Sequence, residues 1–185
     1  MNAHATRILP LLMALAAAST AGDLAAQLSV EFRGGAAIGN HAPAAAGLET
    51  LPGPSVSASA DFQFAYGLGV YALATYGSFQ CEEGFCTGQT LTITSTGFGG
   101  GIRLQPHRLV WARAGALHHG ADVETPGGIL SVDPTLGYDL GAGLTVPLGD
   151  RVHLVTAVSY RSHPDASDRT SVLSGEAGIR IRLTR

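Results

Sequence analysis

The stretch Thr135 to His163, TLGYDLGAGLTVPLGDRVHLVTAVSYRSH, predicts a long β-hairpin. Apolar residues occupy every second position of its first arm, which holds Leu136, Tyr138, Leu140, Ala142, Leu144, Val146 and Leu148. After a tight Pro-Leu-Gly-Asp turn, the same period resumes at Val152, Leu154, Val158 and Tyr160. A period of two residues is typical of a strand with one apolar face. Each arm has at least the roughly 9–11 residues that a tilted strand needs to cross a lipid bilayer.

Six further segments show this alternation or a continuous apolar run, so that the chain holds eight predicted strands. They are residues 28–38, 55–66, 68–79, 89–104, 109–117 and 170–185. The pattern leaves open which face of 68–79 and of 109–117 points outward. The connections at residue 67, at 105–107 and at 147–150 are short, and those at 39–54, 80–88, 118–132 and 163–169 are longer. Short turns on one rim and long loops on the other predict an all-β, eight-stranded antiparallel up-and-down barrel that spans a membrane.

Composition indicates that the apolar face points outward, into lipid. Charged residues make up 14% of the chain, against about 25% in soluble proteins, and none of them is Lys. A lipocalin-like soluble barrel would show the same period with its faces reversed, but its outer face would need many charged side chains. Instead, the polar face of 135–145 is built from Thr, Gly and a single Asp. Small residues of this kind suit a narrow lumen.

The polar parity of the strands predicts a charge network inside the lumen. Its expected members are Glu31, Arg33, Asp61, Asp139, Glu176, Arg180 and Arg182. These groups should pair with one another, because an unpaired charge in such a place is costly. Aromatic residues that lie near short turns are expected to form a girdle at the membrane boundary. They are Phe62, Phe64, Tyr66 and Trp111.

The N-terminal segment 1–26 is predicted to be a secretory signal peptide. It has Arg7, an apolar run from Ile8 to Ala18, and small residues up to Ala26, where we expect cleavage. The alternative, a membrane anchor, needs about 20 apolar residues, and this run ends at Ser19. Residues 28–185 then form one barrel domain. A net charge of −3 on scattered residues gives no indication of nucleic acid as a partner.

The two cysteines of the chain, Cys81 and Cys86, lie in the segment QCEEGFCTG. An exported protein meets an oxidising compartment, so a disulfide across a loop tip is expected. In the chain-entropy model, closing so short a loop stabilises the fold by only ~2 kcal/mol. The alternative is a metal site, but two Cys with no His nearby are a poor ligand set for zinc.

With these features the chain resembles the small eight-stranded outer-membrane proteins of the OmpA-like and OmpX-like kind, often called the outer membrane protein β-barrel domain. The resemblance covers residues 28–185 and rests on the strand number, the turn GLTVPLGDRVHL and the last strand GIRIRL. It implies a location in the bacterial outer membrane, contact with outer-membrane lipid and lipopolysaccharide, and handling by the barrel-assembly machinery. We expect a monomer without a cofactor.

Two segments hold residue types that catalysis or metal binding uses. In YRSHPDASDR, His163 and Ser167 precede Glu176, which weakly resembles the base, nucleophile and acid of the lipid A deacylases. The family's tight His-x-Ser spacing is absent, and a polar turn explains the segment more simply. Around residue 120, imidazoles and carboxylates could bind a divalent metal. They are His118, His119, Asp122 and Glu124. Adjacent His residues on a strand point to opposite faces, so a solvated loop is the favoured interpretation.

Other motifs point to structure and not to chemistry. Arg180 and Arg182 could form a phosphate site, but their parity and the nearby Glu176 favour the lumen. The Gly-rich run 97–101 lacks the strand-to-helix context of a nucleotide loop. The sequence therefore favours a non-catalytic barrel that contributes to envelope integrity or surface interaction. A lipid A-modifying hydrolase and a conduit or binder for small hydrophobic molecules are the alternatives.

Overall fold

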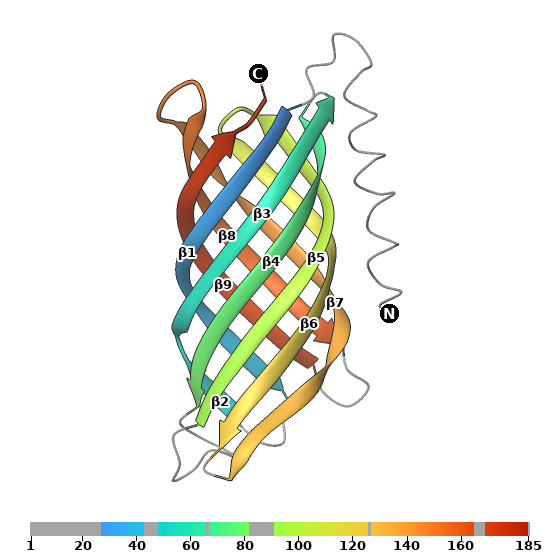
Figure 1. The fold of residues 1–185 in the computed structure, drawn as a ribbon, viewed down its shortest axis with the longest axis vertical. Coiled ribbons are helices and arrows are strands. Elements are labelled where there is room, and N and C mark those ends of the chain that lie inside the picture. The colour runs from blue at the N-terminus through green and yellow to red at the C-terminus, as the bar shows by residue number, and fades with distance from the viewer. Residues whose placement is uncertain are drawn as a thin grey trace, which may run out of the picture.

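The computed structural model describes residues 27–42, 48–65, 67–81, 91–125, 127–164 and 169–184. They form a closed barrel of antiparallel strands with a strong tilt (Figure 1). The strands are β1 (Gln27–Ala42), β2 (Leu48–Leu51), β3 (Gly53–Ala65), β4 (Leu68–Cys81), β5 (Leu91–His107), β6 (Val110–Thr125), β7 (Gly128–Pro147), β8 (Val152–Pro164) and β9 (Arg169–Arg182). Neighbouring strands pair around the barrel, and pairing of β1 with β9 closes it.

The predicted eight-stranded barrel is confirmed, although nine strand segments are present. The short β2 and the longer β3 follow each other across Pro52. Both pair with β1 on one side and with β4 on the other. They therefore share one position in the wall, and the barrel has eight positions.

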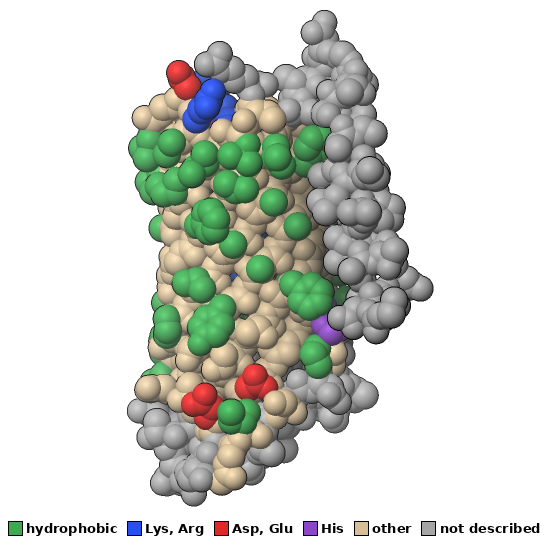
Figure 2. Space-filling model, in the orientation of Figure 1, with side chains coloured by type: hydrophobic (Ala, Val, Ile, Leu, Met, Phe, Trp, Pro, Cys, Tyr) green, Lys and Arg blue, Asp and Glu red, His purple; other side chains and the backbone are tan. Residues whose placement is uncertain are grey.

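The faces of the predicted hairpin are confirmed. Leu136, Leu140 and Leu144 on β7 are exposed on the outer wall, whereas Asp139 and Thr145 are buried. Apolar side chains are spread over the visible wall in Figure 2, and the charged groups of this face lie at its two ends. Among the described residues, no helix is long and apolar enough to cross a lipid bilayer.

The turns of the short-turn rim lie near their predicted places. Gly67 adopts a φ of 79°, and its carbonyl accepts a hydrogen bond of 2.6 Å from the amide of Gln105. A β-carbon on Gly67 would meet the Gln105 carbonyl oxygen at 2.2 Å, so the turn needs glycine. The turn between β5 and β6 lies at residues 108–109, slightly after its predicted position.

The prediction of a long loop at 118–132 is wrong. Residues 118–125 belong to β6 and 128–132 to β7, and the pairing of the two strands continues to Thr125 and Gly128. The register shifts between His119 and Ala121. A shift of this kind puts successive residues out of the two-residue alternation, which is why the sequence pattern was lost there. The β6–β7 hairpin extends to the far end of the barrel in Figure 1.

The placement of Trp111 in the aromatic girdle is also wrong. Its side chain is 0% exposed and lies inside the barrel, where it packs with Val155 and Ala157. The apolar β4 also buries side chains, since Tyr71, Leu73 and Phe79 face the lumen. Strands with apolar residues on both faces give no parity signal, so only the register decides their orientation. The predicted signal peptide, Tyr66 and Cys86 lie outside the described residues.

Candidate functional site

Most of the buried charged side chains in the described part of the chain lie in the lumen of the barrel. Nine charged side chains from seven strands are buried there, and they alternate along those strands with outward-facing residues. They are Glu31, Arg33, Asp61, Arg103, Arg113, Asp139, Arg161, Glu176 and Arg180. Charges buried this deeply need partners, and the lumen supplies them from several strands at once.

Glu31 on β1 is shared by three arginines. Its carboxylate pairs with Arg33 on the same strand, with Arg103 of β5 at 3.2 Å and with Arg180 of β9 at 2.9 Å. Asp61 on β3 contacts two of these arginines, Arg103 at 3.1 Å and Arg180 at 3.6 Å. These contacts link four strands across the lumen, so folding must place all of them before the charges are satisfied.

Glu176 and Asp139 extend the network toward the other half of the barrel. Glu176 contacts Arg33 at 3.2 Å and Arg161 at 3.5 Å, and it accepts hydrogen bonds of 2.7 Å from the hydroxyls of Ser55 and Ser57. Asp139 contacts Arg113 at 2.8 Å and Arg161 at 3.4 Å. The Tyr71 hydroxyl donates a further hydrogen bond of 2.9 Å to Asp139.

Trp111 lies among the arginines of this network. The guanidinium carbon of Arg103 is 4.0 Å from the centre of the Trp111 ring, within the range of a cation–π contact. Arg33 and Arg113 lie at 5.7 Å and 5.8 Å from the same ring. The indole therefore stabilises several cations at once, which explains why an aromatic residue near a turn points inward instead of into lipid.

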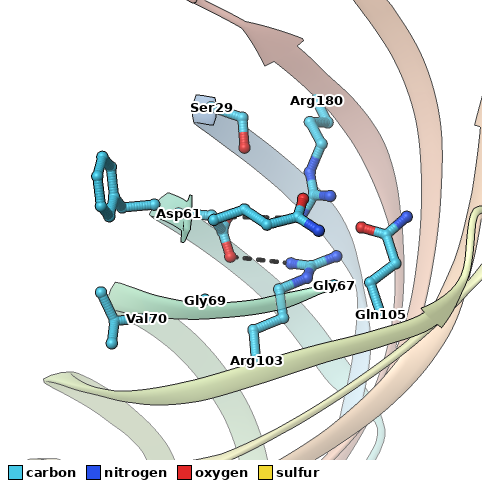
Figure 3. Close-up of a pocket in the computed structure, with 10 residues that line it drawn as sticks. Ser29, Asp61, Gly67, Gly69, Val70, Arg103, Gln105 and Arg180 are labelled. Carbon is cyan, nitrogen blue, oxygen red and sulfur yellow. Dashed lines mark hydrogen bonds and ion pairs between the residues drawn. The ribbon is translucent and has the colours of Figure 1, made fainter. Parts of the chain in front are cut away.

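A small cavity of about 20 Å³ opens beside this network, near the short-turn rim. Its lining includes Asp61, Arg103, Gln105 and Arg180. Figure 3 shows Arg103 reaching toward Asp61 on one side and lying close to Gln105 on the other. A volume of this size holds about one water molecule, so the cavity is far too small for an organic substrate.

Six of the seven predicted network residues meet in the lumen, and Arg182 does not. Arg182 is half-buried and lines a separate, larger pocket at the rim with Gln27 and Asp150. It is the last residue of β9. The prediction also missed Arg103, Arg113 and Arg161. Arg103 and Arg161 alternate with the apolar residues of their strands, so the two-residue period could have identified them as lumen residues. Arg113 lies in the segment 109–117, for which the sequence did not decide which face points outward.

Of the three residues of the deacylase alternative, the structure describes the side chain of Glu176 alone. Glu176 is engaged by two arginines and two serines deep in the lumen. Ser167 lies outside the described residues, and so does the side chain of His163. The structure therefore gives no geometry for this alternative.

The metal alternative is split between the two faces of β6. His118 is exposed and stacks on Phe98 at 5.3 Å between ring centroids, whereas His119 is buried and its Nε2 contacts the Ser95 hydroxyl. Asp122 and Glu124 lie further along the same strand and are exposed. No group of three or more candidate ligands that could hold a metal ion exists among the described residues.

Comparison with known proteins shows a likeness to solved outer-membrane barrels. No family model matches the chain. No curated protein matches it either. Neisserial surface protein A matches with a TM-score of 0.57 at 16% identity, over 83% of this chain and 96% of that one. OprG of Pseudomonas aeruginosa matches with 0.58 at 11% identity, over 89% and 99%.

A third solved structure is similar over most of the chain. Ail of Yersinia pestis, in complex with the heparin analogue sucrose octasulfate, matches with a TM-score of 0.53 at 16% identity, over 84% of this chain and 97% of that one. Identities this low speak for architecture alone. Together with the closed antiparallel wall and its outward apolar face, they show that the chain has the fold of the small eight-stranded outer-membrane β-barrels.

Proposed function

We propose that this protein is a non-catalytic barrel of the bacterial outer membrane that contributes to envelope integrity or surface interaction. An apolar outer wall and a closed hydrogen-bond network are what lipid requires of a membrane-spanning sheet. The fold is that of known outer-membrane proteins, which supports the same location. In this proposal, residues 1–26 are the export signal and lipid and lipopolysaccharide surround a monomeric barrel that the assembly machinery has inserted.

The observation that supports a non-conducting role is that side chains fill the lumen. Nine buried charges, Trp111 and the cluster of Tyr71, Leu73 and Leu117 fill the interior from several strands. The cavity found at the mouth holds about 20 Å³. A pore would need a continuous polar channel, and a barrel of eight strands is too narrow for one once side chains fill it. In this proposal, the protein therefore contacts other molecules through its outer wall, its rims and the β6–β7 hairpin, and not through its lumen.

The location is tested by fractionation and gel electrophoresis. Protein expressed with residues 1–26 should appear in the outer-membrane fraction, lack those residues by mass spectrometry, and migrate faster before boiling than after. Recovery from the periplasm without detergent would contradict the proposal. A variant with Leu140→Arg serves as a control, because a charge in the lipid-facing wall should lower the yield of the fast-migrating form.

The non-conducting, non-catalytic role is tested on purified protein. In planar bilayers it should give no steps of ion conductance, with a known porin as a positive control. Lipopolysaccharide incubated with the protein should keep all its acyl chains in mass spectrometry. Loss of an acyl chain that depends on Ser167 would replace this proposal with the deacylase alternative.

Binding of a small hydrophobic molecule is a second candidate, and a groove on the outer wall favours it. The groove has a volume of about 590 Å³ and an almost wholly apolar lining that includes Phe32, Val56 and Tyr76. Its test is native mass spectrometry of protein released from mild detergent. A retained acyl chain that is lost when Ala74→Phe fills the groove would support this candidate, and equal retention in both proteins would contradict it.

A further inference from the structure

The charges buried in the lumen do not balance. Five arginines, namely Arg33, Arg103, Arg113, Arg161 and Arg180, face four carboxylates, namely Glu31, Asp61, Asp139 and Glu176. Each carboxylate is shared by at least two arginines, and Glu31 by three. All nine side chains are at least nine-tenths buried. One positive charge is therefore left without a counterion among the described residues, which is costly in a place that water reaches poorly.

All five buried arginines have at least one donor without a hydrogen-bond partner among the described residues. Two of them, Arg103 and Arg180, also line the cavity at the short-turn mouth, which indicates where a counterion would be held. Arg103 uses only Nη1 to contact Glu31 and Asp61. Its Nε and Nη2 atoms are buried and have no hydrogen-bond partner among the described residues. A guanidinium presents its donors in a fixed plane, so these two cannot turn toward the same carboxylates. Arg180 reaches the same place from β9.

The cavity at the short-turn mouth is bounded by these two arginines. Arg103, Arg180, Ser29 and Gln105 are among its lining residues, together with Asp61, whose carboxylate already contacts both arginines. Figure 3 shows both guanidiniums beside Asp61 with the Gln105 side chain close to Arg103. The volume of about 20 Å³ accepts a particle of about the size of one water molecule and excludes polyatomic anions such as sulfate or phosphate.

From these observations we infer that the mouth cavity binds a monatomic anion, chloride under ordinary conditions, as the counterion of the arginine-rich lumen. The anion accepts hydrogen bonds from the free donors of Arg103 and is attracted by Arg180. The anion neutralises the excess charge of the lumen. The Asp61 carboxylate also lines the cavity, and its own charge is offset by the ion pairs with Arg103 and Arg180. The site is structural: it binds the folded barrel and has no counterpart in the unfolded chain, so chloride stabilises the fold by mass action.

The first test measures the temperature at which the purified protein in detergent loses its fast-migrating gel form. The midpoint is compared in sodium chloride and in sodium gluconate at equal ionic strength, because gluconate is too large for the cavity. Chloride at ten times its Kd should raise the midpoint by about 3–6 °C. Equal midpoints in the two salts would overturn the inference.

A substitution at Gln105 separates a bound anion from a general salt effect. Gln105→Glu places a carboxylate in the cavity, so it should raise the midpoint in gluconate and abolish the difference between the two salts. Gln105→Met is the matched control, since it removes the same hydrogen bond to the Arg108 carbonyl but adds no charge. It should keep the chloride dependence. A dependence that persists in Gln105→Glu would contradict the site.

Direct observation completes the test and does not depend on any variant. Crystals soaked in bromide should show an anomalous scattering peak within hydrogen-bond distance of Arg103. Arg103→Gln, if it folds, should lose this peak and the chloride dependence, whereas Arg108→Gln, an exposed arginine on the adjacent turn, should keep both. A water molecule in the cavity with no anomalous signal would overturn the inference.

Discussion

The inner and outer faces of β7 place adjacent residues in opposite surroundings. Leu140 is 46% exposed on the outer wall, whereas Asp139 is 1% exposed in the lumen. The outer residue needs only an apolar neighbour, and its contribution is local. The inner residue contacts Arg113, Arg161 and the Tyr71 hydroxyl, which come from three other strands. The difference teaches that the outer wall tolerates single changes at its edges, but the lumen behaves as one connected unit.

The largest loss of stability is expected from removing the charge that the most arginines share. Glu31→Gln should lower the free energy of unfolding by about 3–5 kcal/mol, because three guanidiniums lose a counterion at once. The measurement is urea unfolding in detergent micelles. Glu124→Gln is the control, because Glu124 is exposed near the hairpin end and its loss should have little effect. Similar effects at both positions would show that the lumen network is not a connected unit.

A charge on the outer wall should cost less than the loss of Glu31, and its cost should depend on depth. Leu140→Arg should destabilise the barrel by about 2–4 kcal/mol if it lies near mid-bilayer. Leu136 is on the same face but about 13 Å further along β7 toward the β6–β7 hairpin. This position is nearer the membrane interface, so Leu136→Arg should destabilise the barrel by only about 0–1 kcal/mol. Refolding yields and unfolding in lipid vesicles measure both. A soluble barrel would tolerate the two substitutions equally.

Removing a single neutral hydrogen-bond donor from the lumen network should lower stability less than either charge substitution. Tyr71→Phe removes the hydroxyl that donates to Asp139 and leaves the ring in place. The expected loss is about 2 kcal/mol, typical of a buried hydrogen bond to a charged group. Asp139 keeps its two arginines, so the barrel should still fold. A loss as large as that of Glu31→Gln would mean that the hydroxyl, and not the ion pairs, organises this half of the lumen.

The smallest effect on stability is expected from loss of the predicted disulfide between Cys81 and Cys86. Replacing Cys81 and Cys86 by Ser should leave the folded gel form intact and change stability by at most about 2 kcal/mol. Cys81 is the last residue of β4, and the strand pairing of the wall before it does not depend on a bridge to residue 86. Thiol titration of exported protein tests the bridge itself, and two free thiols would contradict it. Loss of the folded form in the double variant would place this connection among the elements that assembly requires.

Much of the wall could be read from the sequence because alternation is a local signal. The apolar parity of β1, β3, β7 and β9 predicted which side chains face outward, and the structure confirms it for Phe32, Val56 and Leu140 among others. The same parity predicted six residues of the lumen network. It failed for Arg182, because parity gives the face of a residue but not its distance from the rim.

What the sequence alone determined is the two-residue period, the turns of the short-turn rim and the scarcity of charge, which together require a barrel with its apolar face outward. Only the tertiary structure decided which side chains meet in the lumen and how far β6 and β7 pair. Trp111 points inward because arginines from β1 and β5 meet it across the lumen, and the β6–β7 hairpin replaces a predicted loop because its register shifts. The excess of buried arginines over buried carboxylates in the lumen likewise arises from strands far apart in the chain. Local patterns fix the face of each strand, whereas closure of the sheet fixes which faces meet.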